Sequence, residues 1–144
     1  MAEPLEVTVN LTNEKVQFAG VSSSNPDSPI TFDYMPPIGD GQGYTGLELL
    51  LMSFTGCIAT TVLYLLRRMG KNIAGFKVNA KGIRAEQPPL RLEKVFFGFT
   101  LNSKDTGDAD IERAIQLAEE SFCPVWQMAK NNVEIVTGYR IVAS

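Results

Sequence analysis

Apolar residues occupy alternate positions near the start of the chain, from Leu5 to Leu11. A period of two is typical of a strand with one buried face. The alternation continues at residues 16–18 and returns at 30–34, so we predict a meander of three strands. The segment 22–29, rich in Ser, Asn, Pro and Asp, is interpreted as a loop. The Pro and Gly residues of 36–43 exclude regular structure there.

The most apolar stretch runs from Leu47 to Leu66, ends in Arg67 and Arg68, and is closely followed by a glycine. These features predict one long helix, because basic residues favour the negative C-terminal end of a helix dipole and glycine adopts the left-handed cap. About 20 apolar residues also suffice to cross a membrane, but Glu48 and several Ser and Thr residues interrupt this stretch. We therefore expect a helix buried on all sides, by its own sheet and by a second subunit.

Polar and apolar residues alternate again in the segments 76–80, 95–101 and 133–141, which we predict to be strands. Apolar residues recur at helical spacing over 111–122, Pro124 ends that helix, and a short helical turn follows. The order of elements is βββ-α-ββ-α-α-β. This order indicates an α+β fold in which an antiparallel or mixed sheet wraps around a long central helix.

Composition and charge narrow the classes of protein. The 144 residues, 44% of them hydrophobic and 20% charged, predict a single packed domain over residues 1–144. The net charge of −3, without a long basic run, argues against a nucleic-acid partner. The first residues lack the features of a secretory signal, so we expect a cytoplasmic protein with no membrane partner. The absence of histidine excludes Ser-His and Cys-His catalysis and most zinc sites.

The chain has two cysteines, and a reducing compartment keeps such thiols free unless they are catalytic or redox-sensing. Cys57 lies near the middle of the long predicted helix, beside the small residue Gly56. Ser53 and Thr61 share its helix face and offer hydroxyl groups that would stabilise a thiolate. The alternative is that Cys57 is a small hydrophobic residue of the core.

Cys123 directly precedes Pro124, and proline is favoured at the first position of a helix. Cys123 is therefore expected at an N-cap, where unpaired backbone NH groups and the positive end of the helix dipole lower the pKa of a thiol. The alternative is that Phe122 and Cys123 complete the apolar face of the preceding helix.

The segments around both cysteines resemble the OsmC/Ohr family, and its YhfA-like branch most. The similarity extends over residues 46–142 and rests on four segments: Glu48–Ser53, Gly56–Cys57, Leu65–Met69 with Gly75–Phe76, and Glu119–Val125. The resemblance implies the OsmC-like fold, an intertwined homodimer with its long helices packed together and two active sites at the subunit boundary.

The resemblance also implies a thiol-dependent peroxidase. Cys57 would be the thiolate that attacks a hydroperoxide, and Cys123 the resolving thiol that closes a disulfide. An external dithiol, on a lipoyl-protein or a thioredoxin-like protein, would reduce that disulfide, and no metal or organic cofactor is expected. Phe54 and Ile58, beside Cys57, favour an organic hydroperoxide over hydrogen peroxide.

Two features depart from the family pattern. The family's glutamate lies ten residues before the first cysteine, whereas Glu48 lies nine before, so we expect it either at the site or compensating the helix start. The studied peroxidases hold the thiolate with an arginine from the N-terminal strands, but no arginine precedes Arg67 here, and Lys15 is the only earlier cation. Either Arg67 or Arg68 of a second subunit, or Lys15, takes that role, or Cys57 is less activated.

Two other functions fit the same residues. One is a dimeric protein that binds a small hydrophobic ligand, with structural or redox-sensing thiols. The other is a slow thiol-transfer protein, although the chain has no Cys-x-x-Cys motif.

Overall fold

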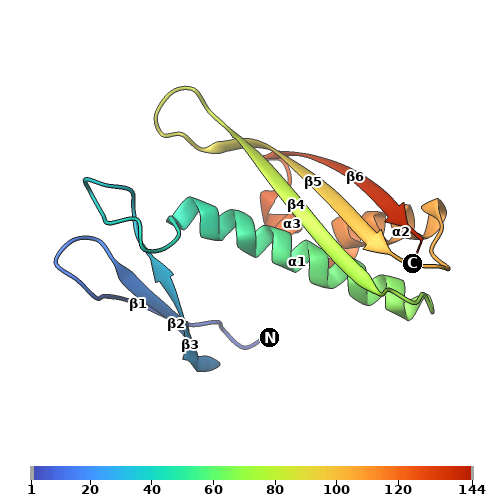
Figure 1. The fold of residues 1–144 in the computed structure, drawn as a ribbon, viewed down its shortest axis with the longest axis horizontal. Helices are drawn as coiled ribbons and strands as arrows, with labels where there is room; N and C mark the ends of the chain where they lie inside the picture. The colour runs from blue at the N-terminus through green and yellow to red at the C-terminus, as the bar shows by residue number, and fades with distance from the viewer. Residues whose placement is uncertain (1, 144) are drawn as a thin grey trace. The chain divides into compact units, whose positions relative to one another are not determined.

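The computed structural model describes residues 2–143. The chain divides into two compact units, one up to Leu50 and one from Leu51 onward. Three strands come first, then a long helix, two strands, two helices joined by a π-helical turn, and a last strand (Figure 1). This order confirms the α+β arrangement expected from the sequence. The prediction of one domain over residues 1–144 stays a prediction.

The first unit contains an antiparallel meander of β1 (Val7–Leu11), β2 (Phe18–Ser22) and β3 (Asn25–Phe32). The interpretation of segment 22–29 as a loop is wrong, because Ser22 pairs with Asn25 across a tight turn and β3 begins at once. The prolines within β3 are tolerated because β3 is an edge strand, whose outer NH groups need no partner.

This meander does not bury an apolar face within its own unit. In the first unit, from residue 2 to Leu50, no hydrophobic side chain belongs to the buried core. Val7 is 69% exposed and Ile30 is 50% exposed. Val9 and Phe32 line an apolar cavity of about 340 Å³ with them. An apolar sheet face of this kind gains free energy only when another surface covers it.

The irregular segment after β3 is organised by a buried carboxylate. Asp33 accepts backbone NH bonds from Tyr34 at 2.7 Å, Gln42 at 2.9 Å and Asp40 at 3.3 Å. These bonds, the one from Gln42 above all, hold the pKa of Asp33 below its ordinary value. The segment is non-repetitive, as its Pro and Gly content predicted.

The long helix α1 (Gly46–Arg68) begins at a capping box. Glu48 Oε1 accepts hydrogen bonds from the backbone NH and the hydroxyl of Thr45, and the Glu48 NH donates to Thr45 Oγ1. The helix ends before Gly70, whose φ of +80° is the left-handed cap that the sequence predicted. By length and composition alone, α1 is apolar enough to cross a membrane.

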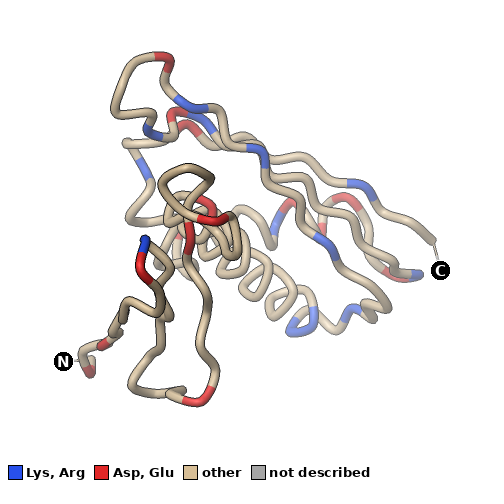
Figure 2. Tube along the Cα trace, turned by 60° about the vertical axis from the view of Figure 1, so that its left-hand side comes forward, with Lys and Arg blue, Asp and Glu red and all other residues tan. Residues whose placement is uncertain are grey.

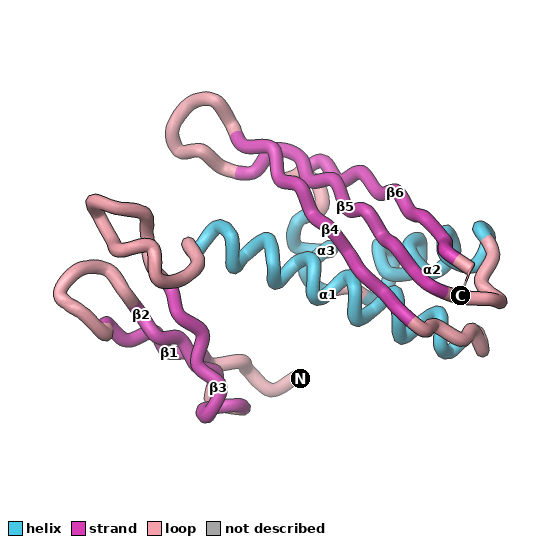
Figure 3. The backbone as a smooth tube through the Cα atoms, viewed as in Figure 1, coloured by secondary structure: helices cyan, strands magenta, loops and turns pink. Residues whose placement is uncertain are grey.

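The second unit packs α1 against a mixed sheet of β4 (Gly75–Arg84), β5 (Leu92–Asn102) and β6 (Glu134–Val142). β5 pairs antiparallel with β4 and parallel with β6. The helices α2 (Asp108–Leu117) and α3 (Pro124–Ala129) lie on the same face of the sheet as α1 (Figures 1 and 3). The parallel pair requires the long crossover that α2 and α3 provide.

The core of the second unit lies between the sheet and these helices. Alternate residues of β5 point into it, in agreement with the predicted period of two. The buried hydrophobic residues are Phe54, Ile58, Val62, Leu65, Leu66, Val95, Phe97, Phe99, Leu101, Ile111, Ala114, Ile115, Ala118, Cys123 and Trp126.

Charge also differs between the two units (Figure 2). The sequence up to Leu50 has seven Asp and Glu residues and a single Lys, whereas the rest has nine acidic and twelve basic residues. The first unit is therefore acidic and the second is mildly basic.

Candidate active site

Cys57 lies within α1, and its side chain is partly buried against the core of the second unit. Its neighbour Gly56 is exposed, and a Cβ atom built at Gly56 would meet no other atom within 4 Å. Gly56 therefore faces open space, next in the chain to the partly exposed Cys57.

Cys123 is positioned by an unusual helical turn. After α2 the chain forms a π-helical turn, Ala118–Phe122, and the Cys123 NH donates to the Ala118 carbonyl, five residues back, at 2.9 Å. Single π turns are frequent at functional sites, because the extra residue re-aims the side chains that follow. Cys123 then serves as the N-cap of α3, with Pro124 at its first position, as the sequence predicted.

Two further residues hold this turn in place, and the sequence analysis did not identify them. Gln127 Nε2 donates to the carbonyl oxygens of Glu119 at 2.7 Å and Glu120 at 3.2 Å, so α3 is tied to the turn before it. Trp126 is 4% exposed, and its ring meets that of Phe54 edge to face at a centroid distance of 6.3 Å. Gln127 thus satisfies carbonyls that a π turn leaves open, and Trp126 anchors α3 to α1.

The two sulfur atoms are neighbours. Cys123 Sγ donates a hydrogen bond to Cys57 Sγ over 3.3 Å, although 66 positions separate the residues in the chain. Both cysteines are free thiols. A disulfide needs a sulfur separation of about 2.05 Å, so a small movement would join them.

The expected fall in the pKa of Cys123 is wrong. Cys123 is 0% exposed, and burial raises the pKa of its thiol to about 11. The backbone NH groups of Trp126 and Val125 lower the pKa, but their effect is smaller than that of burial, and the hydrogen bond to Cys57 raises it further. The N-cap position was predicted correctly, but the sequence did not show that the sulfur is buried.

The hydroxyl group of Thr61 donates its hydrogen bond to the helix backbone rather than to the Cys57 sulfur. Thr61 Oγ1 donates to the Cys57 carbonyl at 2.9 Å, and Thr60 and Thr55 likewise bond carbonyls four residues back. Threonine hydroxyls within helices commonly bond in this way. Ser53 is exposed on α1.

The residues expected to favour an organic substrate point into the core. Phe54 is 6% exposed and Ile58 is 0% exposed, so neither offers surface to a substrate of Cys57. Met52, on α1, is 43% exposed, and Phe122, next to Cys123, is 52% exposed. Within this chain, the apolar part of a substrate can therefore be received only by exposed apolar residues such as Met52 and Phe122.

The structure places the other candidate residues as follows. Glu48 belongs to the capping box of α1, in the first unit. Lys15 Nζ lies 2.6 Å from Asp40 Oδ1, an ion pair within the same unit. Arg68 Nη1 donates to the hydroxyl of Tyr64 at 3.0 Å. A site role for Glu48 or for any of these cations stays a prediction.

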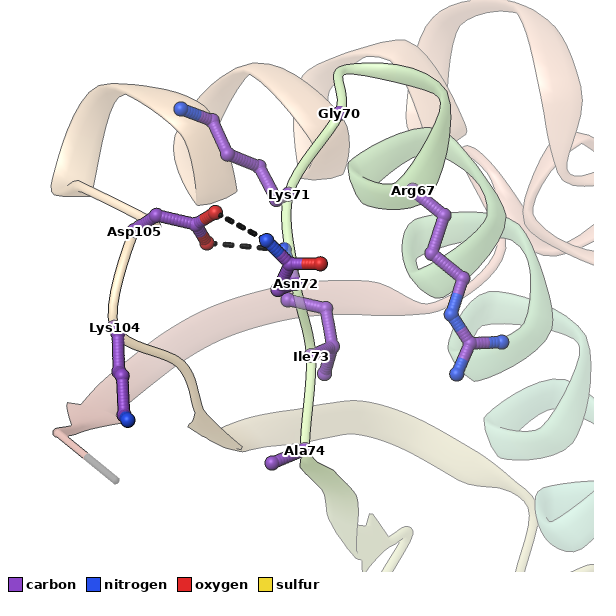
Figure 4. A pocket seen from close by; sticks show the side chains of 8 residues that line it. All are labelled: Arg67, Gly70, Lys71, Asn72, Ile73, Ala74, Lys104 and Asp105. Carbon is purple, nitrogen blue, oxygen red and sulfur yellow. Dashed lines mark hydrogen bonds between the residues drawn. The ribbon is translucent and has the colours of Figure 1, made fainter.

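A polar cavity of about 680 Å³ lies at the C-terminal end of α1 (Figure 4). Arg67 lines one side of it, and Asn72 donates from its backbone and side chain to the two carboxylate oxygens of Asp105. Arg67 is ten residues beyond Cys57, which places it about 15 Å further along the helix. Neither cysteine lines this cavity, so it is distinct from the thiol site.

Fold and site together define a small α+β protein with one dithiol as its chemical centre. Within residues 2–143, no group of three or more Cys, Asp and Glu side chains is placed to hold a metal ion. The two thiols can form sulfenic acid and disulfide.

The chain belongs to the OsmC-like protein family, whose sequence model matches residues 39–138. Protein YhfA of Escherichia coli K12 is 29% identical over 98 residues, which cover 68% of this chain and 73% of YhfA. These findings confirm the resemblance to the OsmC/Ohr family and to YhfA.

Solved structures confirm the fold. An OsmC-like protein from Mycoplasma pneumoniae superimposes with a TM-score of 0.82 at 19% identity, covering 99% of each chain. An organic hydroperoxide resistance protein from Elizabethkingia anophelis gives a TM-score of 0.67 at 16% identity, covering 100% of this chain and 99% of the other. At these identities the similarity shows the shared fold.

Proposed function

We propose that this protein is a thiol-dependent peroxidase in which Cys57 reacts with a hydroperoxide and Cys123 resolves the product. The observation that carries the proposal is the 3.3 Å separation of the two sulfur atoms. Membership of the OsmC-like family supports it, as does the name of the Elizabethkingia neighbour. The partial exposure of Cys57 and the full burial of Cys123 fit an attacking and a resolving thiol, respectively.

The first chemical step takes place at Cys57. Its thiolate attacks the terminal oxygen of R–O–O–H, an S–O bond forms, and the O–O bond breaks. The alkoxide leaves and takes a proton from water to become an alcohol, while Cys57 becomes a sulfenic acid.

The second step uses Cys123. Its sulfur attacks the Cys57 sulfur, an S–S bond forms and the S–O bond breaks, and the hydroxyl group leaves with the Cys123 proton as water. An external dithiol, on a lipoyl-protein or a thioredoxin-like protein, then supplies two hydrogen atoms and becomes a disulfide itself. We propose that exposed apolar residues such as Met52 and Phe122 favour organic hydroperoxides, because an alkyl group gains burial on such a surface.

We propose that the protein acts as a homodimer in the cytoplasm. The open apolar face of the first unit and the exposed apolar residues of α1, such as Tyr64 at 52%, support a second copy as their cover. The two free thiols support the location, because a reducing compartment keeps thiols free.

A titration tests the proposed activity. Reduced protein receives one equivalent of cumene hydroperoxide, and free thiols are counted over time. We expect both thiols to disappear within seconds, and Cys57→Ser to abolish the loss. Unchanged thiols after an hour would instead support a binding protein for a small hydrophobic ligand. Equal rates with hydrogen peroxide would contradict the preference for organic substrates.

A further inference from the structure

A hydrogen bond joins the two sulfur atoms of the thiol pair. Cys123 Sγ is the donor and Cys57 Sγ the acceptor, at 3.3 Å. Cys123 is 0% exposed, so water does not compete for its proton, whereas Cys57 is partly exposed. An S–H donor bonds an anionic sulfur more strongly than a neutral one, because charge strengthens hydrogen bonds.

The cations considered for the activation of Cys57 are engaged or distant within this chain. Lys15 is paired with Asp40 in the first unit. Arg68 bonds the hydroxyl of Tyr64 and lies 5.8 Å from the centre of its ring. Arg67 lines the cavity at the end of α1, far along the helix from the thiols. The Cys123 thiol is thus the polar group that the structure directly bonds to the Cys57 sulfur.

We propose that Cys123 has a second role: its S–H group stabilises the thiolate of Cys57 before any peroxide arrives. In the proposed peroxidase, Cys123 is then a catalytic residue in both steps, first as the hydrogen-bond donor and then as the resolving thiol. This inference deepens the proposed function and rests on it for its meaning in catalysis. The hydrogen bond itself is testable without a peroxide.

The environment of Cys123 suits this role. Burial raises the pKa of the Cys123 thiol to about 11, which keeps the proton on this sulfur at neutral pH. The π turn and the Gln127 amide fix the position of Cys123, which keeps the donor aligned at little entropic cost. The donor loses its proton when the S–S bond forms, because the hydroxyl group of the Cys57 sulfenic acid takes up that proton and leaves as water.

Two substitutions at one position separate the roles of Cys123. Cys123→Ser retains a hydroxyl donor but cannot form a disulfide, and Cys123→Ala removes both functions. The rate of Cys57 alkylation by iodoacetamide, measured against pH, reports the thiolate fraction. We expect the midpoint of this profile to rise by about one pH unit in Cys123→Ala, which lowers the rate about tenfold below the midpoint. Cys123→Ser is expected to stay within about threefold of the unmodified protein, because its donor remains.

Circular dichroism and thermal unfolding of both variants check that the fold is retained, and peptide mass mapping checks that Cys57 is the alkylated residue. An unchanged midpoint in folded Cys123→Ala overturns the inference. The inference is also overturned if the midpoint shifts in Arg67→Gln or Arg68→Gln but not in Cys123→Ala. That result would assign the stabilisation of the Cys57 thiolate to an arginine of a second copy.

The alkylation experiment is independent of the peroxidase assay. If the midpoint rises in Cys123→Ala but hydroperoxide leaves the thiols intact, the hydrogen bond is established and the proposed activity is wrong. If the thiols are lost to hydroperoxide but the midpoint stays constant, the activity stands and the second role of Cys123 is wrong.

Discussion

The two units of this chain differ in how far they bury their apolar side chains. The second unit closes a core of fifteen buried residues between its sheet and its helices, and one of them is Cys123. The first unit, over its described residues, leaves apolar strand residues such as Val7 exposed and lines an open apolar cavity with them. The reactive pair therefore lies in the part of the chain that has its own core. In the proposed dimer, a second copy covers this open face of the first unit.

The buried core of the second unit gives the proposed site a rigid environment. Cys57 and Cys123 come from different helices, and the core residues Phe54 and Trp126 hold these helices against each other. A hydrogen bond between two sulfurs at 3.3 Å requires such a fixed arrangement. The acidic first unit contributes neither cysteine.

The largest expected effect is on the core of the second unit. Phe97→Ala removes a ring that is 1% exposed and packs on Phe54 at 4.8 Å, and should lower the free energy of unfolding by about 3–5 kcal/mol. Phe96→Ala, the next residue on the opposite face of β5 and 38% exposed, is the matched control, with a cost below about 1 kcal/mol. Urea unfolding curves measure both. Equal losses of unfolding free energy in the two variants would contradict a core that lies on only one face of β5.

The second effect tests the open face of the first unit. Val9→Asp places a charge in its apolar cavity and should weaken the proposed dimer at least tenfold, about 1.4 kcal/mol, because the carboxylate must lose its water on association. Sedimentation at several protein concentrations measures the dissociation constant. Thr8→Asp, at the adjacent position of β1, should have a smaller effect. A dimer that tolerates both changes equally is not formed through this face.

The sequence predicted the elements well wherever the hydrophobic period is long. Helix α1 and its Gly70 cap, strand β5 and the Cys123-Pro124 helix start all follow from local pattern. For the first half of strand β3 the sequence predicts a loop, because that half consists of polar residues and prolines, which are permitted in a strand by its edge position in the sheet.

The sequence predicted less of the site than of the fold. The pairing of the cysteines came from the family resemblance, since a separation of 66 residues carries no local signal. The raised pKa of Cys123 depends on burial by residues distant in sequence. The role of Gln127 depends on the π turn, which helical periodicity alone does not reveal.

A smaller effect is expected at the clamp beside Cys123. Gln127→Met keeps the side-chain volume but removes the bonds to the Glu119 and Glu120 carbonyls, at a cost of about 1 kcal/mol. Disulfide closure after oxidation should slow, which stopped-flow thiol assays measure. Gln116→Met, which loses only surface bonds with the Arg113 and Glu120 side chains, is the control. Equal closure rates in the two variants would show that the clamp does not position Cys123.

The smallest effect concerns pH and the first unit. Because the folded pKa of Asp33 is lowered, its contribution to stability is present above the ordinary value of 3.8 and is lost as the pH falls through the lowered value. The protection factor of the Gln42 amide against hydrogen exchange should therefore fall below about pH 3.8, and Asp33→Asn should show a lower protection factor already at neutral pH. Protection of that amide in the variant at the level of the unmodified protein would contradict this role.

The central claim is that Cys57 and Cys123 form a redox pair within one chain. Intact-mass measurement of the reduced protein after one equivalent of organic hydroperoxide, under denaturing conditions that separate any subunits, tests it directly. The account predicts a single chain lighter by two hydrogen atoms, with both cysteines in one disulfide-linked peptide pair. A chain of unchanged mass, a chain that retains an added oxygen atom, or a disulfide between two chains would contradict it.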